Sequence, residues 1–529
     1  MFRLFVVFIF YILSFSIKIT IGANILALMM VISPSHHIWN SALTHTLAEQ
    51  GHNVTVLSVD LPKPSEKLPS NLHYIHLEEG YSIYSGDIKI DLKDYFGISP
   101  LQQIPLFYDT CDTLNQYIVK SKGLHTLLNY PDDFKFDLVL NDYTMGPLLL
   151  GFMHKFKYPP LIGMSAFLNP PITIDQMSHH YFPAYIPYHS TMYSPEMSFW
   201  QRLENTLIFI GDTAYRRLIF LPRADATIRP FFSKDMPYLG DISKHTAISL
   251  VNSHPAINYV EPLPPNIIEV GGMQIKNSKP LPKDLDDFMN DKSKLGTILI
   301  SLGTNMKSED YTEEQIRTIV NTMKSLPNYS FLWKFDAKYL RKEKLPENAI
   351  VRQFFPQSDI LAHPKIKAFV THCGGLSTQE AIWRGVPMVG VPLFFDQHRN
   401  LRNAMTVGVA EKLDFFTMTT ESLRKTILKV LEDPQMQANI KAASVNFRDR
   451  PMPPLETAVW WVEYMLRNPK PTHLKSPAAK LNIFQANSLD CLLFILVVLL
   501  LVIYTTIKLL LFLFLKVIGI QKAVKQKTN

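Results

Sequence analysis

The chain has 529 residues, which is more than one hydrophobic core usually holds and indicates two large domains. The formal net charge of +7 comes from the two ends, because residues 1–23 and the stretch after residue 490 carry two and five basic residues and no acidic ones. The body between them is formally neutral, which argues against a nucleic-acid-binding protein. Three widely spaced cysteines provide neither a disulfide framework nor a metal-ligand spacing, so no metal is predicted.

Residues 1–23 are predicted to be a signal peptide. Arg3 precedes an apolar run over residues 4–17, and the small residues Gly22 and Ala23 follow it. The alternative is an uncleaved membrane anchor, for which this run is short. We therefore expect cleavage near residue 23 and a remaining chain that enters the secretory pathway.

Residues 24–275 are predicted to form a first α/β domain. A strand is expected over 24–32, then a polar loop over 33–37, then a helix and a second strand over 54–59. This opening lacks the Gly-x-Gly-x-x-Gly fingerprint, which argues against a nicotinamide or flavin enzyme. The loop contains His36, which suits general-base work but taken alone is more often an ordinary surface residue.

A further buried strand over 136–140 leads to Asp142. This carboxylate either orients a catalytic histidine or caps a helix expected near Pro147. Aromatic residues are frequent over 60–130 and 165–235, where they either line a binding pocket or pack as ordinary core. The pattern of residues alone leaves both alternatives open.

Residues 276–295 are rich in proline, lysine and aspartate and are predicted to link the first domain to a second one over 296–450. In the second domain a strand over 298–302 runs into Gly303 and Thr304. This is a phosphate-sized turn, although without further information it is an ordinary connection between a strand and a helix.

The most distinctive stretch covers residues 368–397. A short strand and a glycine-containing turn at 371–375 are followed by a helix expected from about Ser377 to Arg384. Glycines let the backbone approach a ligand, and the first amides of a helix favour an anion, so the turn suits a diphosphate. It is not a P-loop, because no Gly-Lys-Ser/Thr follows. Ser377 and Glu380 also match a capping box.

This stretch closely resembles the signature of the UDP-dependent glycosyltransferases, the family of microsomal UDP-glucuronosyl- and UDP-glucosyltransferases. The matching parts are Thr-His-x-Gly at 371–374, the later Glu380, Pro-Met-Val-Gly-Val-Pro at 387–392 and the closing Asp396-Gln397. The resemblance implies the GT-B fold, with two Rossmann-like domains facing each other across a cleft. It also implies a UDP-sugar and a small lipophilic acceptor as substrates, with no cofactor.

The resemblance assigns roles to single residues. His36 would be the catalytic base, with Asp142 holding its ring. The family places a diphosphate on the glycine turns, uracil at Phe354 and Gln357, ribose at Glu380, and the sugar at Asp396 and Gln397. The residues expected to bind the UDP-sugar are Ser301, Gly303, Thr304, Phe354, Gln357, His372, Gly374, Gly375, Ser377, Glu380, Asp396 and Gln397.

Two of these positions depart from the family pattern. Phe354 stands where the family usually has tryptophan, so the ring that stacks on uracil is smaller and lacks an N–H. Cys373 stands in place of a commoner glycine. These departures are the support for another class of function, a catalytically silent lumenal protein that binds lipophiles.

The sugar is expected to be glucose. The Ser-His-His sequence at 35–37 and the Gly-Leu-Ser-Thr-Gln-Glu sequence at 375–380 look most like invertebrate members, which mostly use UDP-glucose. Vertebrate members mostly use UDP-glucuronic acid, so glucuronosyl transfer is the alternative within the family.

The C-terminal part is predicted to anchor the chain in a membrane. Residues 451–490 would form a helix packing back on the first domain and a juxtamembrane segment, and 491–515 a membrane span in which Lys508 snorkels. The basic tail 516–529 would then be cytosolic, giving a single-pass type I protein of the endoplasmic reticulum with lumenal domains.

Two further expectations concern the surface of this lumenal part. N-glycosylation sequons begin at Asn53 and Asn328, although Asn53 opens a strand. Assembly into a homo-oligomer is left open by the sequence.

Overall fold

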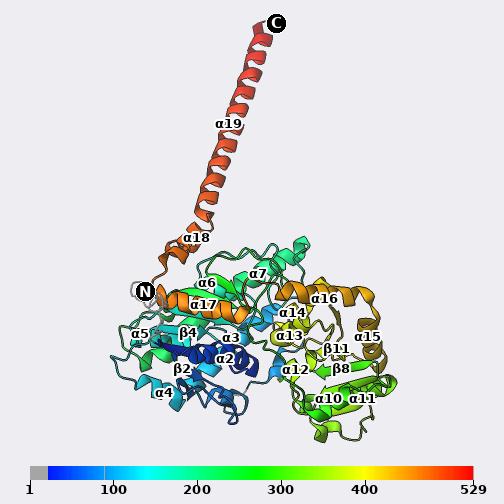
Figure 1. Cartoon of the computed structure of the whole chain (residues 1–529). Coiled ribbons are helices and arrows are strands. Elements are labelled where there is room, and N and C mark those ends of the chain that lie inside the picture. Colours follow the sequence, from blue (N-terminus) through cyan, green and yellow to red (C-terminus); the bar gives the residue numbers. More distant parts are fainter. Residues whose placement is uncertain (1–21, 88–89, 305, 528–529) are drawn as a thin grey trace, which may run out of the picture. The chain divides into compact units, whose positions relative to one another are not determined.

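The computed structural model describes residues 22–87, 90–304 and 306–527. They divide into two compact units: one reaches to Leu474, and the other contains Ser178–His180 and the chain from Lys475 onward. The first unit contains two parallel sheets, each with helices packed around it (Figure 1). Nearly all of the predicted signal peptide lies outside the described residues.

The first sheet has seven parallel strands in the order β3-β2-β1-β4-β5-β6-β7. The order reverses between β1 and β4, and ligands of such sheets bind beyond the carboxyl ends of the strands at this point. The strands are β1 (Asn24–Met29), β2 (Asn53–Ser58), β3 (Leu72–His76), β4 (Leu138–Asp142), β5 (Leu161–Ser165), β6 (Thr246–Val251) and β7 (Ile267–Glu269).

Helix α2 begins earlier than the sequence predicted. It covers Pro34–Glu49, so His36 and His37 lie in its first turn and not in a loop. Proline suits the first helical position, because its fixed φ matches the helix and its missing N–H has no partner there in any case. The other helices of this domain are α3 (Pro100–Ile118), α4 (Lys122–Leu128), α5 (Gly151–Lys155), α6 (Pro171–Gln176), α7 (Phe199–Tyr215), α8 (Leu221–Ile228) and α9 (Leu239–Ser243).

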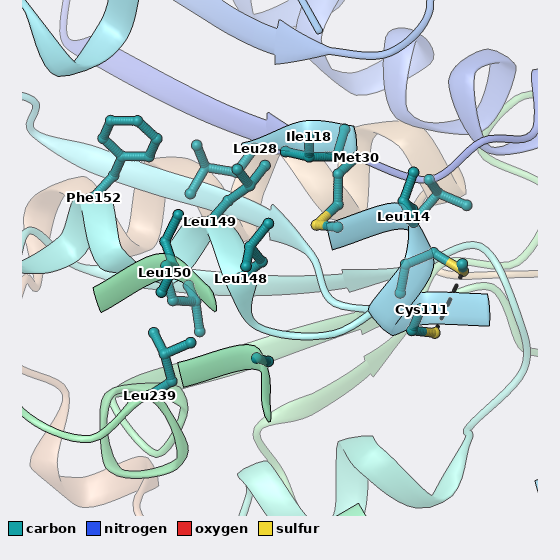
Figure 2. Packing of buried hydrophobic residues seen from close by; sticks show 14 of the residues in the cluster. Leu28, Met30, Cys111, Leu114, Ile118, Leu148, Leu149, Leu150, Phe152 and Leu239 are labelled. Carbon is teal, nitrogen blue, oxygen red and sulfur yellow. Dashed lines mark hydrogen bonds between the residues drawn. The ribbon is translucent and has the colours of Figure 1, made fainter. Parts of the chain in front are cut away.

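Strand β1 is buried on both faces, which explains its continuous apolar sequence. Successive side chains of a strand point to opposite faces. Leu28 therefore belongs to the cluster drawn in Figure 2, which also contains Leu114 and Ile118 of α3. Ala27 belongs to the cluster on the other face, which includes Leu43 of α2.

Helix α17 (Pro454–Arg467) returns from the second domain to the first. Its Ala458 and Val462 lie in the same buried cluster as Leu43, and α17 runs beside α2 in Figure 1. The chain thus crosses between the domains twice. At these crossings Arg450 donates a hydrogen bond of 2.8 Å to the carbonyl oxygen of Gly271.

The second sheet has six parallel strands in the order β10-β9-β8-β11-β12-β13, with its reversal between β8 and β11. The strands are β8 (Gly296–Ser301), β9 (Tyr329–Lys334), β10 (Ala349–Arg352), β11 (Ile366–Thr371), β12 (Met388–Gly390) and β13 (Ala410–Lys412). The helices around it are α10 (Lys283–Met289), α11 (Glu313–Ser325), α12 (Gln357–Leu361), α13 (Gly375–Arg384), α14 (Gln397–Val407), α15 (Thr420–Glu432) and α16 (Pro434–Arg448). Helix α10 lies within the predicted linker and buries Leu285 and Met289.

The alternative that Ser377 and Glu380 form a capping box is wrong. Helix α13 begins two residues earlier than expected, with Gly374 as its N-cap, so Ser377 is already the third helical residue. The end of the helix agrees with the prediction, because Gly385 takes the left-handed conformation (φ 73°) at the C-cap.

The second unit contains α18 (Ile483–Ala486) and α19 (Leu489–Lys527). Residues Leu489–Ile518 of α19 are long and apolar enough to cross a membrane, with a mean hydropathy of 2.7. The predicted span 491–515 falls within this helix. Lys508 lies in its middle, with its ammonium group 5.6 Å from the ring centre of Tyr504.

Candidate active site

The first domain contributes a pair of side chains, His36 and Asp142. His36 lies in the first turn of α2, directly after β1, and Asp142 is the last residue of the neighbouring strand β4. The carboxyl ends of these parallel strands bring the two buried side chains together, with Nδ1 of His36 2.9 Å from Oδ2 of Asp142. A carboxylate only accepts hydrogen bonds, so Nδ1 donates and Nε2 of the neutral ring is left able to take a proton.

Asp142 is kept ionised by its neighbours. Burial by itself would raise the pKa of its carboxyl group, but the interaction with His36 and the hydrogen bonds that Asp142 accepts lower that pKa below the usual value. Asn40 Nδ2 donates to Oδ2 at 2.9 Å, and the backbone N–H of Thr144 donates to Oδ1 at 3.1 Å. The alternative that Asp142 caps the helix near Pro147 is wrong, because that helix has no side-chain cap.

His36 lies at the wall of a cavity of about 210 Å³ between the two domains. Its ring packs edge-on against Phe167, with the ring centres 4.9 Å apart. The rest of the first-domain wall is mostly aromatic and aliphatic. The second domain completes the wall with His372, Gly374, Gly375, Leu376, Phe394, Phe395, Asp396, Gln397 and Arg399.

The ring of His372 lies between two bare backbone turns. Ser301 at the end of β8 is paired with Thr371 at the end of β11, so the turns that follow these strands lie side by side. A Cβ atom on Gly303 would come within 2.6 Å of the His372 ring, and one on Gly374 within 2.4 Å. Any other residue at either glycine would therefore displace the ring.

His372 is neutral at pH 7. Burial and, second, the nearby charge of Lys334 lower its pKa to about 4. A neutral imidazole still donates one hydrogen bond. The N-terminus of α13 begins at Gly375 on the same wall, and its free amides add further donors for an anion. Together these groups place several hydrogen-bond donors on one wall of the cavity, an arrangement that favours an anion.

Lys334 is a candidate residue that the sequence analysis missed. It ends β9, and its Nζ donates to the carbonyl oxygen of Gly303 at 2.8 Å. Burial lowers its pKa, yet it supplies a cation beside His372. The sequence does show a lysine at the end of a buried strand. This lysine can be assigned to the site only when it is known that β9 lies next to β8.

Gln357, Ser377 and Glu380 form a second group at the same edge of this sheet. Nε2 of Gln357 donates to Oγ of Ser377 at 3.1 Å and to Oε2 of Glu380 at 2.8 Å. Burial raises the pKa of Glu380 to about 7, against the opposing effects of that hydrogen bond and of Arg384. Both protonation states of this carboxyl group are therefore populated near neutral pH.

The two neighbouring phenylalanines at 354 and 355 have different environments. Phe355 is buried in the core, whereas Phe354 is 65% exposed, as a ring that stacks on a base must be. The ammonium group of Lys63, from the first domain, lies 4.7 Å from the ring centre of Phe354. The exposed ring is thus already in contact with a cation from across the domain boundary.

Asp396 and Gln397 both line the cavity, but each is partly engaged within the protein. Oε1 of Gln397 accepts from the backbone N–H groups of Leu393 and Phe394, at 2.8 and 3.3 Å, which leaves its Nε2 for a ligand. Nδ2 of Asn400 donates to Oδ2 of Asp396 at 2.7 Å. Burial raises the pKa of the Asp396 carboxyl group.

The predicted UDP-sugar residues fall into two sets. Five of them line the cavity with His36: His372, Gly374, Gly375, Asp396 and Gln397. The other seven, Ser301, Gly303, Thr304, Phe354, Gln357, Ser377 and Glu380, lie outside the cavity wall. Ser301 is buried at the end of β8, and Thr304 is exposed.

The two glycosylation sequons stay predictions. Asn53 and Asn328 are both exposed. The amide of Asn53 donates to the side-chain oxygen of Asn24 at 3.1 Å, which ties it to the neighbouring strand.

Cys373 adopts a backbone conformation that favours glycine over residues with a side chain such as cysteine. Its φ is 60°, in the left-handed region, and its side chain is buried. Asn400 donates to its carbonyl oxygen at 3.0 Å and Thr371 Oγ1 accepts from its N–H at 3.2 Å. The turn therefore keeps the geometry expected for glycine, with these bonds opposing the strain.

Solved glycosyltransferases share this architecture. The calicheamicin glycosyltransferase CalG4 aligns with a TM-score of 0.55 and 16% identity, covering 85% of this chain and 100% of its own. Glycosyltransferase VinC in complex with DTDP aligns with a TM-score of 0.56 and 16% identity, covering 84% and 100%. At this identity the likeness establishes the fold alone, and it confirms the predicted GT-B arrangement of two Rossmann-like domains.

Sequence comparison gives the family. The family model described as UDP-glucoronosyl and UDP-glucosyl transferase matches residues 25–524. UDP-glucosyltransferase 2 of Dactylopius coccus is 34% identical over 494 residues, 90% of each chain, and UDP-glucuronosyltransferase 2B15 of Homo sapiens is 30% identical over 499 residues, 91% and 92%. The chain therefore belongs to the UDP-glucuronosyl and UDP-glucosyl transferase family and is an enzyme that transfers a sugar from a UDP-sugar.

Proposed function

We propose that the protein transfers glucose from UDP-glucose to a hydroxyl group of a small lipophilic acceptor, with inversion at the anomeric carbon. The observation that carries the proposal is the position of His36. Its hydrogen bond to the ionised Asp142 leaves Nε2 free to accept a proton, at the wall of the same cavity as the glycine turn of the second domain.

The proposed reaction is a single displacement. The acceptor oxygen attacks the anomeric carbon and passes its proton to Nε2 of His36, while the bond from that carbon to the β-phosphate oxygen breaks and UDP leaves. Asp142 stabilises the imidazolium that forms. General-base assistance of this kind contributes about 10²–10⁴-fold.

UDP leaves with added negative charge, and the second domain would stabilise it. His372, the amides of the turn at Gly374 and the N-terminus of α13 are fixed in place before the reaction, which makes such electrostatic stabilisation effective. Lys334 would add a positive charge behind this turn. Gln357 and Glu380, joined by a hydrogen bond, would bind the base and the ribose.

The acceptor is proposed to be apolar because of the first-domain wall. The residues that line the cavity near His36 include Tyr84, Phe107, Tyr108, Phe167 and Tyr188, with Ile104 and Ile172. Such walls suit a flat, weakly polar molecule such as a phenol. The same wall would exclude bulk water from the reacting centre.

Glucose is favoured over glucuronic acid by the family comparison. The Dactylopius relative at 34% identity is named a UDP-glucosyltransferase, and the human relative at 30% a UDP-glucuronosyltransferase. Glucuronosyl transfer is the second candidate because of that human relative.

The lumenal location is also proposed. The apolar span of α19 would anchor the protein as a single-pass type I protein of the endoplasmic reticulum, with both sheets in the lumen. Protease protection of intact microsomes, with and without detergent, tests this topology. Digestion of the two domains without detergent would contradict it.

The test of the reaction is UDP release from microsomes that express the chain. UDP-glucose and UDP-glucuronic acid are compared side by side against a panel of phenols and flavonoids, with EDTA present and absent. We expect acceptor-dependent release with UDP-glucose, no effect of EDTA, and a β-linked product by NMR. Release with UDP-glucuronic acid alone would overturn the choice of sugar.

A further inference from the structure

We propose that the buried ion pair of Glu261 and Arg399 makes the enzyme select a donor with an uncharged sugar. Glu261 neutralises the charge of Arg399, which lines the cavity close to the proposed sugar-binding residues Asp396 and Gln397. A sugar carboxylate would therefore find no unpaired cation there. This inference rests on the proposed function, because it assumes that the donor is UDP-glucose.

The pair is built from both domains. Glu261 lies between β6 and β7 of the first sheet, and Arg399 is the third residue of α14, two positions after Gln397. Nη2 of Arg399 lies 2.8 Å from Oε1 of Glu261, and the side chains are only 4% and 8% exposed. Nδ2 of Asn169 donates to Oε2 of Glu261 at 2.8 Å, so both carboxylate oxygens are occupied.

The charge of the guanidinium group is balanced while this pair is intact, and one of its nitrogens is already engaged. Nη2 also donates to Oδ1 of Asn258 at 3.3 Å, and the group lies 5.8 Å from the ring centre of Tyr259. Its Nε has no hydrogen-bond partner among the described residues, although it is buried. Arg399 is therefore fixed by first-domain groups at the edge of the cavity, with a donor still unused.

Arg399 is the only lysine or arginine among the described residues that line the cavity. Three histidines also line the cavity, and none of them replaces it. His36 is already paired with Asp142. Burial and the charge of Arg399 lower the pKa of His189 to about 3, and burial and the charge of Lys334 lower that of His372 to about 4. A glucuronate carboxylate beside Asp396 would thus face a carboxyl group and an arginine that is already neutralised.

Buried ion pairs are sensitive to the loss of one partner, because the remaining charge is left uncompensated. If Glu261 loses its charge, Arg399 becomes an unpaired cation at the cavity, and a sugar carboxylate becomes its natural counter-ion. The bland alternative is that the pair only joins the two domains. In that case its loss weakens the use of every donor to the same extent.

The experiment measures kcat/KM for UDP-glucose and UDP-glucuronic acid in four forms of the full chain: unchanged, Glu261→Gln, the double variant Glu261→Gln/Arg399→Gln, and Glu196→Gln. Glutamine keeps the shape of Glu261 and its hydrogen bond from Asn169. Glu196 is an exposed carboxylate of the same domain and controls for charge removal. A thermal melt with each nucleotide sugar reports binding separately from turnover.

We expect Glu261→Gln to raise the ratio of glucuronate to glucose kcat/KM by at least about tenfold, since selectivity is a difference between two affinities. The double variant and Glu196→Gln should keep the original ratio, and UDP-glucuronic acid should stabilise Glu261→Gln more than UDP-glucose does. An unchanged ratio in Glu261→Gln, with a normal melt, would overturn the inference. So would a ratio that stays raised in the double variant.

Failure of the proposed function gives a different result. If the unchanged chain already uses UDP-glucuronic acid better than UDP-glucose, the choice of glucose is wrong before any variant is compared. If it prefers UDP-glucose and Glu261→Gln keeps that preference, only the role of the ion pair is wrong.

Discussion

At the first sheet, the candidate site is a network of polar side chains of which His36 reaches the cavity wall. His36, Asp142 and Asn40 are buried and hydrogen-bonded to one another at the ends of β1 and β4. At the second sheet, two glycines without side chains, Gly303 and Gly374, enclose the neutral ring of His372. Both edges are switch points of a parallel sheet. The first depends on specific side chains, and the second depends on two glycines that leave room for the ring of His372. Different substitutions should therefore disable them.

The largest effect is expected at the first sheet. His36→Ala removes the proton acceptor, and we expect kcat to fall by about 10²–10⁴-fold with UDP binding unchanged. UDP release and UDP titration measure the two quantities. His37→Ala is the matched control, since His37 is the next residue of the same helical turn and is not among the described cavity-lining residues. Equal losses in both variants would contradict the assignment.

At the second sheet, an added side chain at a glycine should reduce activity. Gly374→Ala puts a Cβ atom 2.4 Å from Nε2 of His372, so the ring must move from the position proposed to contact the diphosphate. We expect kcat/KM for the donor to fall by about 10²-fold, the usual consequence of misplacing a group by about 1 Å. In Gly211→Ala on α7 the new atom meets neighbours only at 3.8 and 3.9 Å, so this variant should behave normally. Normal activity of Gly374→Ala would show that the ring position is not needed.

A pH titration should separate the two edges further. The pKa of Glu380 is raised to about 7, so this carboxyl group becomes protonated as the pH falls below 7. In the proposed site the ribose hydroxyls donate to the ionised form of Glu380, so UDP binding should weaken by up to about tenfold for each pH unit below 7. Glu380→Gln should bind UDP weakly without this slope. A slope that persists in Glu380→Gln would assign the proton to another group.

The raised pKa of Glu380 should affect stability in the opposite direction to UDP binding. The folded pKa of Glu380 lies above its ordinary value of 4.5. Between pH 4.5 and 7 the folded protein therefore holds a proton that the unfolded chain has released. The contribution of this group to the free energy of unfolding falls as the pH rises through that window. Measurement of UDP affinity and of thermal stability across pH 5–8 should thus show opposite trends for this residue.

The smallest effect is expected at Cys373. Cys373→Gly relieves a left-handed conformation but removes a buried side chain, and these changes oppose each other. We expect the free energy of unfolding to change by less than about 1 kcal/mol. Cys111→Gly, in the middle of α3, loses packing and helix propensity together and should cost about 2–3 kcal/mol. Denaturant melts compare the two, and equal losses would mean that the strain at Cys373 is small.

The sequence predicted the parts of the molecule that depend on local pattern. The strands around 298–302 and 368–370 and the end of α13 at Gly385 follow from apolar runs and stop signals, and they agree with the structure. The two helix starts at Pro34 and Gly375 were placed too late. In both cases a residue read as a loop signal, proline or glycine, serves as the first turn or cap of the helix.

Other parts of the site depend on contacts that no local pattern contains. Lys334 matters because β9 lies beside β8, and the sequence does not give the order of strands. The pairing of Glu261 with Arg399 joins residues 138 positions apart, from different domains. Motif matching brought in Gln357 and Glu380 separately, and only the fold shows that they share a hydrogen bond.

The double crossing of the chain between the sheets limits how the cavity can open. A single connecting segment would leave the second domain free to rotate about more than one axis relative to the first. Here the outgoing chain at Gly271 and the returning chain at Arg450 are joined by a hydrogen bond, and α17 is packed onto α2 beyond it. Two anchored crossings define an axis, so the expected domain motion is a hinge rotation about the line that joins them. Substrates would then enter and leave from the side opposite that axis.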